Sequence, residues 1–209
     1  MRARGGMGTT GGMGGSGRRT RNRLWLLIGA IALLILVTVI AWRRYGENVY
    51  RQVYPFSYRA IIVRNAEAHG LDPLLVAAVI KAESNFWTWA VSKKDARGLM
   101  QLTPPTGRWV AGQLGMPDFK EQMLHDPEFN IALGCWYLSH LLADYGGSLP
   151  MALAAWNGGR TNVDSWLYSG RWSGRLEEVN RIPFAETRAF VPRVLANLGW
   201  YKKLYGDGQ

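Results

Sequence analysis

The hydrophobic pattern is dominated by a run of 19 residues without a charge, from Leu24 to Trp42. As an α-helix this run would be about 28 Å long, which matches a bilayer hydrocarbon core of about 30 Å. Trp25 and Trp42 stand near its two ends, where indole rings favour the membrane interface. The run therefore predicts a single transmembrane helix over residues 24–42.

A cleaved signal peptide is the alternative for this segment. The apolar core of a signal peptide usually has about 7 to 15 residues and ends at a small-x-small site. This run is longer and ends at Ile40-Ala41-Trp42. Four arginines between residues 18 and 23 favour a cytoplasmic N-terminus. We expect a flexible Gly- and Arg-rich cytoplasmic tail over residues 1–23, a linker over 43–54, and a single-pass protein of the cell membrane whose remaining part is extracytoplasmic.

Residues 55–205 show the start and stop signals of helices. Three Asp-Pro or Thr-Pro pairs offer a side-chain cap followed by proline at the first helical position: Asp72-Pro73, Thr103-Pro104 and Asp126-Pro127. Three glycines stand where helices would end: Gly70, Gly115 and Gly146. The predicted helices are 58–69, 73–84, 104–114, 127–145, 149–156 and 184–204. Because no long stretch alternates apolar and polar residues, we expect an all-α domain.

The net charge of +10 is unevenly distributed along the chain. Residues 1–44 hold eight arginines and no acidic residue, which leaves 17 Lys and Arg against 15 Asp and Glu for the rest. The predicted domain is therefore nearly neutral, and nucleic acid is not an expected partner. The single cysteine, Cys135, cannot form an intrachain disulfide, and no Cys/His cluster has metal-ligand spacing. We expect no metal and no organic cofactor, and the sequence predicts no particular protein partner.

The predicted helix that starts at Pro73 is apolar on almost every face and ends at Glu83. A helix that is apolar all round is buried, so Glu83 would emerge from the core among apolar neighbours. Desolvation and the negative end of the helix dipole both disfavour its ionised form. Glu83 is therefore a candidate general acid. The alternative is an exposed last-turn residue, or an ion-pair partner of Lys81 or Arg97.

Short motifs follow one another along this domain. They are Glu83-Ser84-x-Phe86, Ala90-Val91-Ser92, Ala96-Arg97-Gly98-Leu99-Met100-Gln101, Pro104-x-Thr106, Asn130-Ile131-x-x-Gly134, Ala154-Ala155-Trp156-Asn157-Gly158-Gly159 and Ile182-Pro183-x-x-Glu186-Thr187-Arg188. In this order and spacing they resemble the lytic transglycosylases whose catalytic domain has a lysozyme-like fold. The resemblance covers roughly residues 55–205. It implies a helical, two-lobed domain with a saccharide cleft, preceded here by one transmembrane helix.

The resemblance also implies an activity and a catalytic residue. Enzymes of this family cleave the β-1,4 bond between N-acetylmuramic acid and N-acetylglucosamine in peptidoglycan glycan strands and leave a 1,6-anhydro-muramic acid end. Their catalytic Glu corresponds to Glu83. This chemistry needs one acid/base group, whereas ordinary glycosidases use two carboxylates. Asp95 and Glu186 are the other acidic candidates, and we expect structural roles for their charges.

By the same correspondence, the expected substrate-binding residues are Ser92, Gln101, Trp156, Asn157 and Glu186. Ser92 could instead be a turn residue, and Glu186 could simply favour the start of a helix. Trp156 stands where the family has tyrosine, and it replaces a phenolic hydroxyl by an indole N–H. Phe190 likewise stands in place of a tyrosine.

Tryptophans at 87, 89 and 172 are expected to be exposed platforms on which sugar rings stack. Two other functions remain open at this point. A hydrolytic muramidase would leave a free reducing end, and a glycan-binding or scaffold domain of an envelope assembly would bind without cleaving. The intact Glu83-Ser84 pair and Gln101 argue against the binding domain, whereas Trp156 and Phe190 leave room for it.

Overall fold

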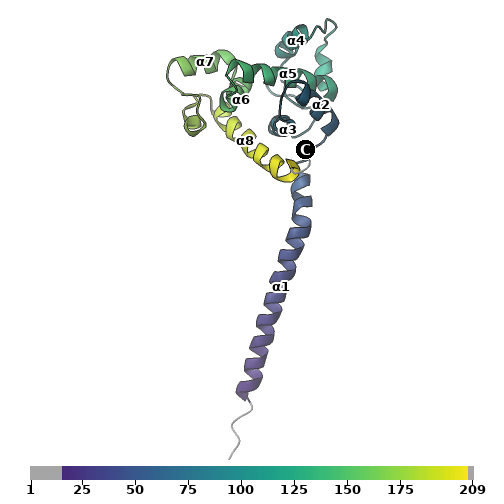
Figure 1. Cartoon of the computed structure of the whole chain (residues 1–209), viewed down its shortest axis with the longest axis vertical. Helices are drawn as coiled ribbons and strands as arrows, with labels where there is room; N and C mark the ends of the chain where they lie inside the picture. The colour runs from purple at the N-terminus through teal and green to yellow at the C-terminus, as the bar shows by residue number, and fades with distance from the viewer. Residues whose placement is uncertain (1–15, 207–209) are drawn as a thin grey trace, which may run out of the picture. The chain divides into compact units, whose positions relative to one another are not determined.

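The structure, a computed structural model, describes residues 16–206 and divides the chain into two units. One unit comprises the residues up to Val49, and the other runs from Tyr50 onwards (Figure 1). Most of the predicted flexible tail, residues 1–15, lies outside the described residues. The two units are described separately below.

The first unit consists of the long helix α1, Ser16–Val53, up to its residue Val49. Within the described residues, its stretch Trp25–Trp42 is the one helical segment long and apolar enough to cross a membrane. All apolar side chains described in this stretch are exposed. The helix extends beyond the predicted 24–42 in both directions. Once a helix is formed, each further residue adds a hydrogen bond, and residues 43–53 contain no proline that would stop it.

The second unit begins at Tyr50 rather than at the predicted residue 55. Tyr54, expected to lie in a linker, stacks on Trp200 with ring centroids 5.6 Å apart. The Tyr205 hydroxyl donates a hydrogen bond to the Tyr54 carbonyl at 2.8 Å. These contacts make the end of the expected linker part of the folded domain.

All six predicted helices are present with ends within two residues of their expected positions. The α-helices are α2 Arg59–Ala68, α3 Pro73–Glu83, α4 Pro104–Gln113, α5 Pro127–Asp144, α6 Leu149–Gly158, α7 Arg160–Tyr168 and α8 Ala185–Tyr205; two 3₁₀ helices are η1 Glu121–His125 and η2 Leu176–Arg181. The helix α7 and both 3₁₀ helices were not predicted. Between residues 16 and 206 there is no strand, only two isolated bridges. The all-α prediction is confirmed.

Hydrogen bonds at the helix ends confirm the predicted signals. Asp72, Thr103 and Asp126 each accept a hydrogen bond from a backbone N–H in the first turn of the following helix. Such a cap contributes about 1 kcal/mol. The three predicted end glycines all have positive φ: Gly70, Gly115 and Gly146. The Asp-Pro and Thr-Pro pairs therefore determine where α3, α4 and α5 begin.

The helix α3 lies at the centre of the second unit. Every residue from Pro73 to Ile80 is buried, as the apolar pattern predicts. Its most extensive packing is against α8, and it also contacts α2. The side chain of Asn197 on α8 donates a hydrogen bond to the Ala78 carbonyl at 3.3 Å, across the interface. The position of α3 is thus fixed from several sides, and with it the position of its last residue, Glu83.

Two hydrophobic cores divide this unit. The larger core includes α3 and residues of α2, α5, α6, α7 and α8. The smaller core is built from the loop before α4, α4 itself, η1 and α5: Leu102, Val110, Ala111, Leu124 and Leu133. The helix α5 contributes to both, and α4 and α7 lie at opposite ends of the unit in Figure 1. This division into two parts creates the place for a cleft between them.

Candidate active site

The structure brings all six predicted site residues to one pocket of about 320 Å³. Glu83 reaches it from the end of α3, Ser92 and Gln101 from the loop between α3 and α4, Trp156 and Asn157 from α6, and Glu186 from the start of α8. Leu102 of the smaller core and Ala155 of the larger core both line the same pocket. The pocket therefore lies where the two parts of the domain meet.

Glu83 is a partly buried carboxyl group held by one hydrogen bond. The indole N–H of Trp156 donates to Glu83 Oε1 at 2.8 Å. Burial raises the pKa of Glu83 from 4.5 to about 7. The Trp156 hydrogen bond and the positive charge of Arg193 lower this pKa, and the negative charge of Glu186 raises it. Because desolvation dominates, Glu83 keeps a proton up to neutral pH, as a general acid requires.

The partner of Glu83 is a group that can only donate. An indole N–H has no lone pair to offer, so it cannot accept the proton of a neutral carboxyl group. Oε1 acts as the acceptor, which favours the acidic proton on Oε2. Glu83 forms an ion pair with neither Lys81 nor Arg97, the two alternatives that its sequence position suggests. Lys81 donates to Val53 O and Asn85 Oδ1, and Arg97 pairs with Asp95 and Glu121.

The loop between α3 and α4 is built by its own polar groups. The Ser92 hydroxyl oxygen accepts hydrogen bonds from the backbone N–H groups of Lys94 and Ala96, at 3.2 and 3.0 Å. The Gln101 amide nitrogen donates to the carbonyls of Ala90 and Gly98, at 3.1 and 2.9 Å. Ser92 is therefore a turn residue, as its alternative interpretation stated. A ligand could still receive the Ser92 hydroxyl proton and donate to the Gln101 amide oxygen.

Buried contacts fix this loop against the smaller core. Asn130 has no exposed surface; it accepts from the Met100 N–H at 2.7 Å and donates to the carbonyls of Arg97 and Leu124 at 3.0 and 2.7 Å. Gly98 has a φ of +76°, and a Cβ atom there would lie 2.0 Å from the Leu124 carbonyl oxygen. Only glycine fits this approach.

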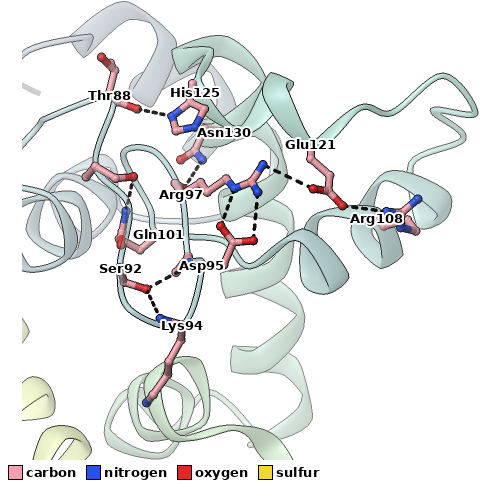
Figure 2. A network of polar contacts seen from close by, with 12 residues as sticks. Thr88, Ser92, Lys94, Asp95, Arg97, Gln101, Arg108, Glu121, His125 and Asn130 are labelled. Carbon is pink, nitrogen blue, oxygen red and sulfur yellow. Dashed lines mark hydrogen bonds and ion pairs between the residues drawn. The ribbon is translucent and has the colours of Figure 1, made fainter.

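A network of ion pairs also holds the loop between α3 and α4 in place (Figure 2). Arg97 forms two hydrogen bonds with Asp95, at 2.8 and 3.0 Å, and lies 3.5 Å from Glu121, which also pairs with Arg108. Asp95 has a φ of 61°, a left-handed conformation that aspartate tolerates. The bond to Arg97 is the main reason why the pKa of Asp95 is lowered. The negative charge of Asp95 is therefore paired with Arg97 within the loop, which is the structural role expected for it.

Glu186 is the other acidic residue at the pocket, and it is paired. Lys94 Nζ lies 3.0 Å from Glu186 Oε2, and this hydrogen bond is the main reason why the Glu186 pKa is lowered. The Asn157 amide donates to Glu186 Oε1 at 3.5 Å and accepts from the Thr187 hydroxyl at 2.8 Å. The position of Lys94 at the pocket was not predicted from the sequence, because a lysine in a loop is usually exposed to solvent without a fixed partner.

The three tryptophans predicted as exposed platforms divide into two groups. Trp87 and Trp89 are 62% and 66% exposed, as predicted. The prediction for Trp172 was wrong, because its side chain has no exposed surface. Its indole N–H donates to the Arg175 carbonyl at 3.0 Å, and the ring belongs to the larger core. Glycine and serine around Trp172 let the loop fold back over the ring instead of presenting it.

Comparison with known proteins gives a consistent result. The family model described as the transglycosylase SLT domain matches residues 60–178. Soluble lytic murein transglycosylases from Salmonella typhimurium and Escherichia coli are both 31% identical over 158 residues, which is 74% of this chain and 24% of each relative. A membrane-bound lytic murein transglycosylase C from Yersinia pestis is 35% identical over 117 residues, 51% of this chain and 32% of that protein.

Solved structures show the same likeness. An inactive mutant of the lytic transglycosylase Slt from Pseudomonas aeruginosa superposes with a TM-score of 0.67 at 34% identity, over 75% of this chain and 25% of that one. The 70 kDa soluble lytic transglycosylase from Escherichia coli gives a TM-score of 0.70 at 29% identity, over 75% of this chain and 26% of that one. The match thus spans about a quarter of the length of these relatives.

The raised pKa of Glu83 predicts that Glu83→Gln stabilises the protein at pH 8 but hardly changes it at pH 4. The unfolded carboxyl ionises near 4.5 and the folded one near 7, so wild type loses stability as the pH rises through this window. Glutamine has no charge to desolvate. With allowance for partial exposure, we expect a gain of about 2 kcal/mol at pH 8, seen as a higher Tm in thermal unfolding.

Glu67→Gln on α2 is the matched control, because Glu67 is exposed. This variant should unfold like wild type at both pH values. An equal effect of Glu83→Gln at pH 4 and pH 8 would show that Glu83 is not a desolvated carboxyl group.

Proposed function

Because the chain belongs to the transglycosylase SLT family, we propose that it cleaves the glycan strands of peptidoglycan as a membrane-anchored lytic transglycosylase. The observation that carries this proposal is the carboxyl group of Glu83. It is the one pocket carboxyl whose pKa is raised by burial among the described residues, and it points into a pocket with polar groups for sugar hydroxyls.

In the proposed reaction Glu83 acts twice. Its Oε2 proton passes to the oxygen that joins N-acetylmuramic acid to N-acetylglucosamine, and the C1–O bond breaks. The carboxylate then removes the proton from the C6 hydroxyl of the same muramic acid, whose oxygen forms the new bond to C1. The product is a 1,6-anhydro ring, and Glu83 ends the cycle protonated again. No water molecule is consumed.

The pairing of the second carboxylate supports this route over hydrolysis. A hydrolytic mechanism with two carboxylates needs the second one free to act as nucleophile or to activate water. Glu186 is instead bound to Lys94 and Asn157. A pKa near 7 suits a single group that must both give and accept a proton near neutral pH.

Digestion of purified peptidoglycan by the full chain in detergent tests this proposal. We expect 1,6-anhydro-muropeptides in the mass spectrum of the released products, and a loss of at least about a thousandfold in rate for Glu83→Gln, because general acid–base catalysis contributes about 10²–10⁴ per step. Free reducing ends would make the protein a muramidase. Binding to the polymer without release of products would make it a glycan-binding domain.

The hydrogen bond from Trp156 predicts a shift of the pH profile in Trp156→Phe. Without the indole N–H, the ionised form of Glu83 loses a donor and its pKa rises. The alkaline limb of kcat/KM should therefore move to higher pH by up to about one unit. Trp156→Tyr restores a donor and should bring the limb back towards that of wild type.

Trp200→Phe is the control for this experiment, because Trp200 stacks on Tyr50 and Tyr54 and does not line the pocket. Its pH profile should match that of wild type. If the alkaline limb of kcat/KM were unchanged in Trp156→Phe as well, the hydrogen bond from Trp156 would not affect the pKa of Glu83.

The apolar stretch of α1 supports the anchoring part of the proposal. Trp25–Trp42 is long and apolar enough to span a bilayer, and arginines precede it in the sequence. We place the residues before it in the cytoplasm and the domain from Tyr50 onwards outside the cytoplasmic membrane, where peptidoglycan lies.

Fractionation of cells tests the anchor and its direction. The uncleaved chain should sediment with membranes, resist extraction by high salt and dissolve in detergent. Protease added to the outside of spheroplasts should remove the domain. A shortened, soluble protein would show that the apolar stretch is a cleaved signal, and a domain protected from outside protease would reverse the proposed topology.

A further inference from the structure

Three ring side chains form a surface beside the candidate active-site pocket, and we call this surface the aromatic shelf. They are Trp109 on α4 and Trp136 and His140 on α5. The Trp136 and His140 rings are stacked, with centroids 4.9 Å apart and planes at 13°. Trp109 meets both edge-on, at 5.4 and 5.5 Å. None of the three belongs to the family motifs described above.

The aromatic shelf does not serve core packing alone. Trp109 keeps 40% of its surface exposed, although an aromatic ring gains most when it is fully covered. Trp136 only borders the smaller core, which Leu102, Leu124 and Leu133 fill. Edge-on contacts with His140 and Trp136 hold the Trp109 ring in place without covering it. The arrangement therefore presents a supported aromatic surface to solvent.

A continuous row of rings joins the aromatic shelf to Glu83. Trp156, which donates to Glu83, lies 5.3 Å from the ring of Tyr137. Tyr137 lines the pocket and meets Trp109 edge-on at 5.9 Å. On α4, Thr106 also lines the pocket and lies one turn before Trp109. The surface of the pocket thus continues along α4 and α5 to Trp109.

Polar side chains border the aromatic shelf on its α5 and α7 side. Asp144 lies 3.6 Å from His140 and 3.0 Å from Arg160, and the Arg160 guanidinium lies 3.5 Å from His140 Nε2. Arg160 directly follows Gly159, which lines the pocket. An aromatic face with charged hydrogen-bonding groups at its edge suits a sugar ring, which has apolar C–H faces and hydroxyl groups around its rim.

We propose that the aromatic shelf binds sugar residues of a peptidoglycan glycan strand at a distance from the bond that Glu83 cleaves. This inference rests on the proposed function. A pocket of about 320 Å³ is at the small end of ligand sites, so a polymer bound at Glu83 has to leave the pocket across the surrounding surface. The row of rings from Trp156 to Trp109 offers such a path. Binding there would favour long strands over short ones.

Equilibrium binding of peptide-free glycan strands of four and of at least eight sugars tests this proposal. The measurements use the full chain in detergent with Glu83→Gln as the parent, so that no strand is cleaved. The parent should bind the long strands more tightly than the short ones. Trp109→Ala in the same background should weaken binding of the long strands about fivefold and leave the tetrasaccharide unchanged. Trp109→Phe, which keeps an aromatic face, should recover most of the loss.

Tyr168→Ala is the matched control, because Tyr168 is an aromatic residue with 97% of its surface exposed at the end of α7. It should not change binding of either strand. Equal affinities of Trp109→Ala and its parent for long strands would overturn the role of the aromatic shelf and leave the proposed function intact. No binding of any strand by the parent, together with no digestion by wild type, would overturn both.

A second measurement does not depend on the folding of Trp109→Ala. The indole N–H signal of Trp109 in an NMR spectrum, assigned by its absence from Trp109→Phe, should shift when the parent binds long strands and stay in place with the tetrasaccharide. A signal that does not move with long strands, while the signal of Trp156 does, would contradict the proposal.

Discussion

The burial of α3 from Pro73 to Ile80 is the constraint on which the rest of the domain depends. Because no face of this helix is polar, α2 and α8 have to pack against it, and its last turn is the first point where the chain can carry a polar group. Lys81 and Glu83 lie in that turn, and Glu83 is the last residue of the helix. The same packing that stabilises the fold therefore removes water from the carboxyl group and raises its pKa to about 7. Core formation and acid strength have one physical origin, so the cost of desolvating Glu83 is set by the elements that hold the domain together.

The remaining groups at the pocket reach it from both sides of the cleft. The loop between α3 and α4 presents Ser92 and Gln101. It keeps its shape because the buried Asn130 side chain forms hydrogen bonds with three backbone groups, of which two belong to this loop and one to Leu124 of η1. On the opposite side, Thr187 and Glu186 orient Asn157. The Lys94–Glu186 pair joins that loop to the start of α8 across the pocket. The cleft is thus defined by polar contacts between two cores, whereas each core is held by apolar packing.

Local signals explain why so much of this architecture could be predicted from the sequence. Caps such as Asp72 and end glycines such as Gly70 act through neighbouring residues, and together they mark six helix ends in α2, α3, α4 and α5. What could not be predicted depends on distant contacts. The helix α7 begins at Arg160, directly after α6, and its N-cap residue Gly159 has no side chain that could mark the start. Trp172 is buried only because its loop folds back on the larger core, and Lys94 meets a partner 92 residues away. The motifs predicted six site residues, and the structure brings all six to one pocket. The role of each residue stays a prediction.

Trp156 shows how a departure from a family motif can keep one property and lose another. A tyrosine hydroxyl can donate to an ionised carboxylate and accept from a neutral one, whereas an indole N–H can only donate. The donor is retained, since the bond to Glu83 is 2.8 Å long. What is lost is a group that could compete with substrate for the acidic proton. With Oε1 held as an acceptor, the proton on Oε2 has no partner at Trp156, and in the proposed reaction it is left for the oxygen of a bound sugar. The larger ring also reaches Tyr137 at 5.3 Å, and so it extends the aromatic surface from the carboxyl group towards α4. One substitution therefore favours proton donation and begins the row of rings that leads out of the pocket.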